Sequence, residues 1–153
     1  MIYVGYQGIG KSSISGKNNC IDLESGNFWV DDKRVDDWYK IYVNIAEHLS
    51  NQGYRVFMSS HKVVREELNN RGIEFTTICP SLNLKEQWLN RLQERFDKTR
   101  SMKDFKALKN AEEMYEENIK DLTSERNTII ITDINYDLSD YLKSSGDDNE
   151  AME

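Results

Sequence analysis

The sequence is poor in proline, cysteine and histidine, and these shortages exclude several classes of protein. It contains one proline, two cysteines and two histidines in 153 residues. Cys20 and Cys79 fall within apolar stretches and lack the spacing of metal ligands, so we expect two buried, reduced thiols. His48 and His61 have no partner at a catalytic spacing, and we assign them no catalytic role.

Basic tracts and long hydrophobic runs are also missing. The net charge of -7 and the pI near 5.0 argue against nucleic acid as a partner. Because no apolar run reaches about 18 residues and no signal peptide is visible, we expect a soluble, cytoplasmic protein with no membrane partner. An acidic chain that binds phosphate must gather its few cations in one place, which makes the arginine positions informative.

Short apolar runs and helical patterns alternate along the chain. Runs rich in β-branched residues predict five strands, at 2–5, 19–23, 54–60, 73–79 and 128–133. Most are apolar without alternation, as in a parallel sheet covered on both faces. Apolar periodicity predicts helices at 36–53, 61–72, 81–100 and 102–125. The alternation predicts an α/β fold with a parallel five-stranded sheet flanked by helices.

Three of these helices carry an expected buried stripe, which in the helix at 81–100 consists of Leu84, Trp88, Leu92 and Phe96. In the helix at 36–53 the stripe consists of Trp38, Ile41, Ile45 and Leu49, spaced three and four apart. In the helix at 102–125 it consists of Phe105, Leu108, Met114, Tyr115, Ile119 and Leu122. The chain is long enough for one domain, which we place at residues 1–142. The small, polar and acidic residues 143–153 are expected to form a disordered tail.

A glycine-rich motif follows the first predicted strand. Gly5, Gly10, Lys11 and Ser12 satisfy the pattern G-x-x-x-x-G-K-[ST], in which backbone N–H groups cradle a phosphate chain. The lysine reaches the β- and γ-phosphates, the hydroxyl of Ser12 binds Mg²⁺, and the following helix start favours negative charge. The residues expected to hold the nucleotide are Gly8, Ile9, Gly10, Lys11, Ser12 and Ser13.

With the additional Gly8, the motif reads G-x-x-G-x-G-K-S and resembles the small P-loop kinases, namely nucleoside monophosphate, shikimate and gluconate kinases. The guanine-reading motif of a GTPase, Asn-Lys-x-Asp, is not in the sequence. The resemblance covers residues 1–142 in layout, and only the phosphate loop is a strong motif. It implies a three-layer P-loop NTPase fold, ATP and Mg²⁺ as cofactors, and a lid at about residues 97–104.

Two carboxylates lie where these kinases hold their acceptor. Asp22 and Glu24 are two residues apart on the extended segment where the second strand ends, so their side chains point the same way. The resemblance implies that Asp22 holds Mg²⁺ through water and that Glu24 orients or deprotonates the acceptor; ordinary surface acids at a strand end are the alternative. Asp133 is a rival metal ligand after the fifth strand, where we favour a structural or base-side role.

Cationic and aromatic residues complete the expected site. After the third strand, Ser59, Ser60, Lys62 and Arg65 resemble the acceptor-binding residues of gluconate kinase. Lys62 and Arg65 are three apart and could clamp an acceptor phosphate, or could be solvated helix charge. Arg91 and Arg95, with Arg100 as a third candidate, resemble the lid arginines that neutralise the transferring phosphoryl group; helix ion pairing is the alternative. Phe28 or Trp29 would stack on a nucleobase, or would belong to the core.

Together these features predict ATP-dependent phosphoryl transfer to a nucleoside or deoxynucleoside monophosphate. The catalytic residues would be Lys11, Asp22, Glu24, Arg91 and Arg95. A small-metabolite kinase of the gluconate or shikimate type is one alternative, and a nucleotide-binding regulatory protein without turnover is another. The charged segment 98–125 is compatible with a mobile lid plus helix or with a partner surface.

Overall fold

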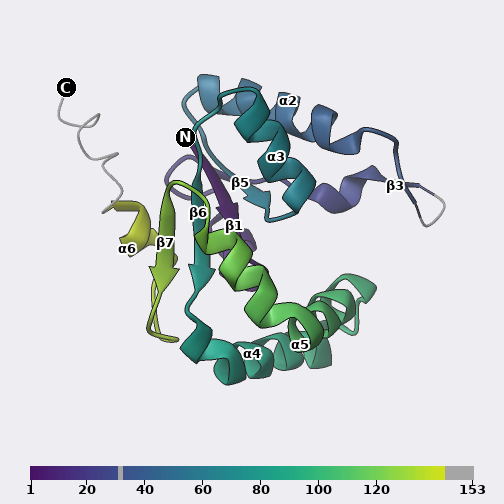
Figure 1. Cartoon of the computed structure of the whole chain (residues 1–153), viewed down its shortest axis with the longest axis vertical. Coiled ribbons are helices and arrows are strands. Elements are labelled where there is room, and N and C mark those ends of the chain that lie inside the picture. The colour runs from purple at the N-terminus through teal and green to yellow at the C-terminus, as the bar shows by residue number, and fades with distance from the viewer. Residues whose placement is uncertain (31–32, 144–153) are drawn as a thin grey trace. The chain divides into compact units, whose positions relative to one another are not determined.

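A computed structural model describes residues 1–30 and 33–143 of the chain (Figure 1). The predicted tail at 143–153 falls, beyond its first residue, outside these described residues. The elements in chain order are β1 (Ile2–Gly5), α1 (Lys11–Ile14), β2 (Cys20–Asp22), η1 (Ser25–Phe28), β3 (Trp29–Val30), β4 (Lys33–Arg34), α2 (Trp38–Asn51), β5 (Arg55–Ser59), α3 (Lys62–Asn70), β6 (Thr76–Pro80), η2 (Leu82–Leu84), α4 (Lys85–Thr99), α5 (Met102–Thr123), β7 (Thr128–Ile131) and α6 (Leu138–Lys143).

The predicted α/β class and the parallel five-stranded sheet flanked by helices are confirmed. The strand order is β2-β5-β1-β6-β7, so β1 lies between β5 and β6. Tyr3 of β1 is in register with Phe57 of β5 and with Thr76 of β6, and both pairs are parallel. From β1 the chain runs to β2 and β5 on one side, and then crosses to β6 on the other side. The carboxyl end of β1 is therefore the point at which the strand order reverses, where open α/β sheets bind ligands.

The chain divides into two compact units, one formed by Met1–Gln7 and Lys11–Ile78 and the other by Gly8–Gly10 and Cys79–Glu153. In the first unit, α2 and α3 lie side by side and α2 packs on β5 and β1 (Figure 1). The core there is built from buried apolar residues of β1, α2, β5 and α3, including Ile2, Val4, Val43, Ala46, Val56, Met58, Val64 and Leu68. The unbroken apolar strands are thus explained by burial of the central sheet.

The stripe predicted for α2 is wrong in two positions. Ile41 and Ile45 are 45% and 39% exposed, whereas Tyr42, Val43 and Ala46 are fully buried beside Trp38. Tyr42 can be buried because its hydroxyl group bonds to the backbone of two neighbouring segments, which offsets the cost of removing it from water. The predicted stripe therefore covers only part of the buried face, since Trp38 and Leu49 face the core and Ile41 and Ile45 do not.

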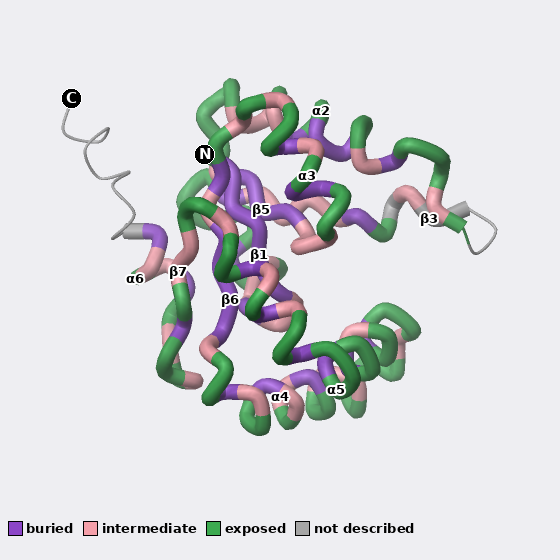
Figure 2. Tube along the Cα trace, in the orientation of Figure 1, coloured by how far each residue is buried: buried purple, intermediate pink, exposed green. Residues whose placement is uncertain are grey.

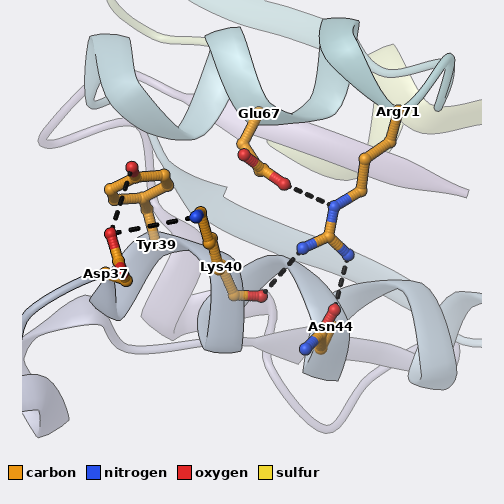
Figure 3. Close-up of polar contacts among 6 residues, drawn as sticks. All are labelled: Asp37, Tyr39, Lys40, Asn44, Glu67 and Arg71. Atoms are coloured by element: carbon orange, nitrogen blue, oxygen red, sulfur yellow. Dashed lines mark hydrogen bonds and ion pairs between the residues drawn. The ribbon is translucent and has the colours of Figure 1, made fainter.

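Arg71, at the end of α3, joins that helix to α2 (Figure 3). Its Nε lies 2.6 Å from Oε2 of Glu67, one turn earlier on α3. The other guanidinium nitrogens donate to Oδ1 of Asn44, at 2.5 Å, and to the carbonyl oxygen of Lys40, at 3.2 Å. Because a guanidinium group offers several donors in a rigid plane, one side chain fixes the spacing of the two helices.

In the second unit, α4 and α5 pack along each other (Figure 1). Buried and exposed positions alternate with a helical period along α5 (Figure 2). Leu108, Tyr115, Ile119 and Leu122 are buried as predicted, but Phe105 and Met114 are 38% and 37% exposed, and Ala111 is buried instead. The small side chain of alanine allows close helix contact, which a count of large apolar residues overlooks.

The segment predicted as a lid, 97–104, forms a tight turn between α4 and α5. Arg100 adopts a left-handed conformation, with φ of 53°, and ends α4. The hydroxyl group of Ser101 accepts a hydrogen bond from the backbone N–H of Asp104, which caps the start of α5. Thr99 donates to the carboxylate of the same Asp104, at 2.5 Å. The capped turn thus joins two helices directly.

Three further features concern the sequence predictions. Cys20 and Cys79 are buried free thiols, as expected. The short antiparallel pair formed by β3 and β4 was not predicted, because two-residue strands carry no periodic signal. Within the described ranges 1–30 and 33–143, no helix combines the length and apolar character that crossing a bilayer requires.

Candidate functional site

The glycine-rich loop predicted to bind phosphate, here called the phosphate loop, follows β1 at the centre of the sheet. Its first amide, N–H of Tyr6, donates to the carbonyl oxygen of Ile78 at 2.9 Å and so ties the loop to β6. Gly8 and Gly10 have φ of 87° and 104°, the left-handed region that favours glycine. A Cβ at Gly10 would meet nothing within 4 Å, so only the backbone angle requires glycine at that position. Left-handed residues in a short loop turn N–H groups to one concave side, which is the geometry of an anion nest.

The polar side chains that follow the loop are suited to phosphate and Mg²⁺. Nζ of Lys11 donates to the carbonyl oxygen of Gly5, at 3.1 Å, which folds the side chain back over the loop. Ser12 and Ser13 are exposed at the start of α1, while the side chain of Ile9 is buried and leaves only its backbone for a ligand. The backbone angles and the cation therefore fit a polyphosphate.

The helix after the loop is short. α1 spans Lys11–Ile14, and Gly16, Asn18 and Asn19 then adopt positive φ. One turn of helix has a weak dipole, because the dipole is the sum of aligned peptide units. An anion held at this loop would therefore be bound by the loop amides and Lys11 more than by the helix.

Gly8 is required by its neighbours as well as by its backbone angle. A Cβ on Gly8 would lie 3.0 Å from Cδ2 of Leu92 and 3.1 Å from Nε1 of Trp88, both on α4. These contacts are tighter than packed carbon atoms tolerate, so α4 or the loop would have to move. The second glycine of the motif thus marks the place where α4 packs against the loop.

Gly8→Ala is expected to lower the free energy of unfolding by about 2–4 kcal/mol, since it adds overpacking of about 1–3 kcal/mol to a left-handed backbone penalty of about 1 kcal/mol. Gly16→Ala is the matched control, because Gly16 has φ of 84° but a Cβ there meets nothing within 4 Å. Urea denaturation measures both variants. Equal losses in the two variants would contradict a close approach of α4 at Gly8.

Asp22 and Glu24 lie near the hydroxyl group of Tyr42. Burial raises the pKa of Tyr42 to about 12, and the charges of both carboxylates contribute to the rise. The backbone N–H of Asp22 donates to Oγ of Ser15 at 3.2 Å, which joins the end of β2 to the turn after α1. The structure therefore brings the two predicted carboxylates into one neighbourhood, at the carboxyl end of β2.

A hydrogen-bond network around Tyr42 fixes the ends of β2 and β5. The Tyr42 hydroxyl donates to the carbonyl oxygen of Leu23 at 2.5 Å and accepts from N–H of Ser59 at 2.9 Å. Oγ of Ser59 donates to Oγ of Ser25, also at 2.9 Å. These hydrogen bonds thus hold four elements together at the predicted acceptor site, namely β2, η1, α2 and β5. The sequence analysis did not identify Ser25 and Tyr42 as members of this site.

Arg34 and His61 form a second cluster, which the sequence analysis also missed. A guanidinium nitrogen of Arg34 lies 3.2 Å from Nε2 of His61 and 3.5 Å from Oγ of Ser25. The guanidinium carbon lies 4.5 Å from the centre of the Trp38 ring, in cation–π contact. Since a guanidinium group can only donate, Nε2 of His61 accepts and the ring is neutral with its proton on Nδ1.

Three cationic side chains act on this histidine electrostatically, and Arg34 is in direct contact with it. Burial lowers the pKa of His61 to about 4, and the charges of Arg34, Lys11 and Arg65 lower it further in the same direction. The neutral ring can sit among these cations because it adds no charge of its own. In a chain with a net charge of -7, this gathering of positive charge beside the phosphate loop is suited to a multiply charged anion.

Among the residues predicted after β5, Lys62 and Arg65 differ in environment. Arg65 is 6% exposed, and its Nε donates to the carbonyl oxygen of Ser60 at 3.1 Å. Lys62 is exposed at the start of α3. The two residues predicted to clamp an acceptor phosphate therefore differ in burial, with Lys62 exposed and Arg65 buried.

Phe28 packs among aromatic residues of the first unit. Its ring centre lies 5.8 Å from that of Tyr42 and 6.1 Å from that of Trp38. Phe28 is partly buried against the core, in line with the core alternative. Trp29, the other stacking candidate, has a side chain outside the described part of the structure.

The predicted lid arginines bind groups of the protein. Arg91 donates to three oxygens, among them the carbonyl oxygen of Gly8 in the phosphate loop, at 3.3 Å. Nε of Arg95 lies 3.4 Å from the carboxylate of Asp104. The guanidinium group of Arg100 lies over the ring of Phe96, at 5.3 Å. These contacts favour helix pairing and loop support as the roles of the three side chains.

Asp133 supports the turn after β7. Its carboxylate accepts a hydrogen bond from N–H of Asn135 at 2.9 Å, the pattern of an Asx-turn. Within residues 1–30 and 33–143 there is no group of three or more His, Cys, Asp and Glu side chains arranged to hold a metal ion. Ser12, Asp22 and ligand phosphate oxygens would be the donor set for Mg²⁺, which prefers few protein ligands.

No family model matches the chain, and no curated protein matches it in sequence.

Proposed function

We propose that this chain is a P-loop phosphotransferase that transfers the γ-phosphoryl group of ATP·Mg²⁺ to a nucleoside or deoxynucleoside monophosphate. The single observation that carries the proposal is the loop after β1, in which Gly8 and Gly10 adopt left-handed backbone angles directly before Lys11. Two polyanions must meet in this reaction, the triphosphate of the donor and the phosphate of the acceptor. A site built to bring them together needs cations beyond the loop lysine, and Arg34 and Arg65 supply them.

The donor side of the proposed site is the phosphate loop. Backbone amides of residues 8–13 and Nζ of Lys11 would bind the phosphates, while Ser12 and Asp22 would hold Mg²⁺. The bound Mg²⁺ supplies charge neutralisation on the phosphate oxygens. Glycine conformations at 8 and 10, at the point where the strand order reverses, support this assignment.

The acceptor side is the polar surface formed by β2, η1, β4 and the start of α3. Arg34 of β4 and Arg65 of α3 would bind the acceptor phosphate, with Ser60 just before α3 and Lys62 at its first position. Glu24, near the Tyr42 hydroxyl, would orient the attacking oxygen. Catalysis would come from positioning and charge neutralisation, in a protein of the cytoplasm.

A panel of acceptors tests the proposal. ATP-to-ADP conversion is measured with each ribo- and deoxynucleoside monophosphate, with gluconate, with shikimate and with no acceptor. We expect turnover with at least one monophosphate and at least 10²-fold less turnover without an acceptor. Turnover with gluconate or shikimate alone would instead identify a small-metabolite kinase. ATP binding with no stimulated turnover would identify a regulatory nucleotide-binding protein.

A further inference from the structure

Two side chains of the second unit hold consecutive carbonyl groups of the phosphate loop. A terminal nitrogen of Arg91 donates to the carbonyl oxygen of Gly8 at 3.3 Å and to the hydroxyl oxygen of Tyr136 at 3.0 Å. The Tyr136 hydroxyl in turn donates to the carbonyl oxygen of Ile9 at 2.5 Å. The second terminal nitrogen of Arg91 donates to the carbonyl oxygen of Ile134 at 2.9 Å. Arg91 and Tyr136 therefore connect the loop to the segment after β7.

Aromatic packing fixes both donors. The rings of Trp88 and Tyr136 are nearly parallel, at 10°, with centres 6.1 Å apart. The guanidinium carbon of Arg91 lies 4.7 Å from the first ring centre and 5.2 Å from the second. Burial raises the pKa of Tyr136, so the phenol keeps its proton and remains a donor at neutral pH. A Cβ on Gly8 would lie 3.1 Å from Nε1 of Trp88, so the backbone of the loop lies close to α4 at this point.

The orientation of these carbonyl groups determines where the loop amides point. In a planar trans peptide, the C=O of one residue and the N–H of the next point in opposite directions. The chain contains no cis peptide bond among its described residues. A hydrogen bond to the carbonyl of Gly8 therefore sets the direction of N–H of Ile9, and the bond to the carbonyl of Ile9 sets that of Gly10.

We propose that Arg91 and Tyr136 are positioning residues that hold the outward carbonyls of Gly8 and Ile9, so that the amides of Ile9 and Gly10 face the nucleotide phosphates. This inference rests on the proposed function for its ligand, and it gives Arg91 a role different from the transition-state contact suggested by the sequence. It also assigns Tyr136, which follows β7 and lies outside the glycine-rich motif, a role in holding the loop.

Tyr136→Phe tests the proposal, since it removes one hydroxyl group and keeps the ring. The first measurement is the ¹⁵N order parameter of Ile9 and Gly10, expected near 0.85 in the wild type and below about 0.6 in the variant. The second is steady-state kinetics, in which KM for ATP should rise about 5- to 30-fold with kcat changed less than about threefold. Arg91→Met should show the same pattern.

Tyr115→Phe is the matched control, because the Tyr115 hydroxyl donates to the carbonyl oxygen of Ser81, at 2.7 Å, outside the loop. Loop order parameters and KM of Tyr136→Phe equal to those of Tyr115→Phe would overturn the proposal. So would a loss of kcat of about 10²-fold or more in Arg91→Met at unchanged KM, which would return Arg91 to the chemical step. If the wild type binds no nucleotide, the proposed function fails, and the order parameters alone then decide whether the two residues hold the loop.

Discussion

Lys11→Met is expected to lower ATP-dependent turnover by about 10²- to 10³-fold, the usual loss when one preorganised charge donor is removed from a reacting group. The ammonium group of Lys11 is the cation of the loop, and it contacts the carbonyl oxygen of Gly5 at 3.1 Å. A bound phosphate chain would draw it away from that carbonyl toward the transferring group. Coupled assays at saturating acceptor measure the effect.

Folding is expected to change little in Lys11→Met, because the bond to Gly5 is one partly buried hydrogen bond worth about 1 kcal/mol. Lys17→Met is the matched control, since Lys17 is an exposed residue of the turn after α1. Turnover of Lys17→Met should stay within about twofold of the wild type. Full activity in a folded Lys11→Met protein would show that the phosphate loop takes no part in phosphoryl transfer.

Arg34→Met is expected to raise KM for the acceptor by about 10- to 100-fold, with KM for ATP changed less than about threefold. A charge-assisted hydrogen bond to phosphate contributes about 1.5–3 kcal/mol, which sets this range. Arg34 is held in place by the Trp38 ring and by Nε2 of His61, so its side chain is already ordered before the acceptor binds. Initial rates with each substrate varied in turn separate the two constants.

Lys33→Met provides the control for Arg34→Met, since Lys33 is the neighbouring exposed cation of the same short strand. It removes the same charge from the protein without the contacts to His61 and Trp38. If both variants raise the acceptor KM equally, the effect is long-range attraction and Arg34 is no specific ligand. A rise in KM for ATP alone would place Arg34 on the donor side.

The sheet and its helices were predictable because burial leaves a strong signal. Strand β5, with Val56, Phe57 and Met58 fully buried, reads as an unbroken apolar run, as a central parallel strand must. Gly53 and Gly72, with positive φ, follow the ends of α2 and α3 and were visible as stop signals. The buried face of α2 was not predictable from aliphatic spacing, because Tyr42 is buried through hydrogen bonds made by residues distant in sequence.

The candidate site was predictable only where its residues are local in sequence. Gly8, Gly10 and Lys11 fall within one motif, and their backbone angles and charge agree with it. Arg34 and His61 are 27 residues apart, and only folding brings the guanidinium group to Nε2. Tyr136 bonds to Ile9 across 127 residues. Single hydrogen bonds between distant residues leave no periodicity or spacing in the sequence. For this reason the sequence analysis gave His61 no role.

The most direct test of phosphate binding by this loop is a crystal structure of the complex with a non-hydrolysable ATP analogue and Mg²⁺. The account predicts phosphate oxygens within about 2.7–3.2 Å of the amide nitrogens of Ile9, Gly10 and Lys11, with Nζ of Lys11 moved from the carbonyl oxygen of Gly5 to a phosphate oxygen. An analogue bound elsewhere on the protein, with Nζ still on Gly5, would contradict it.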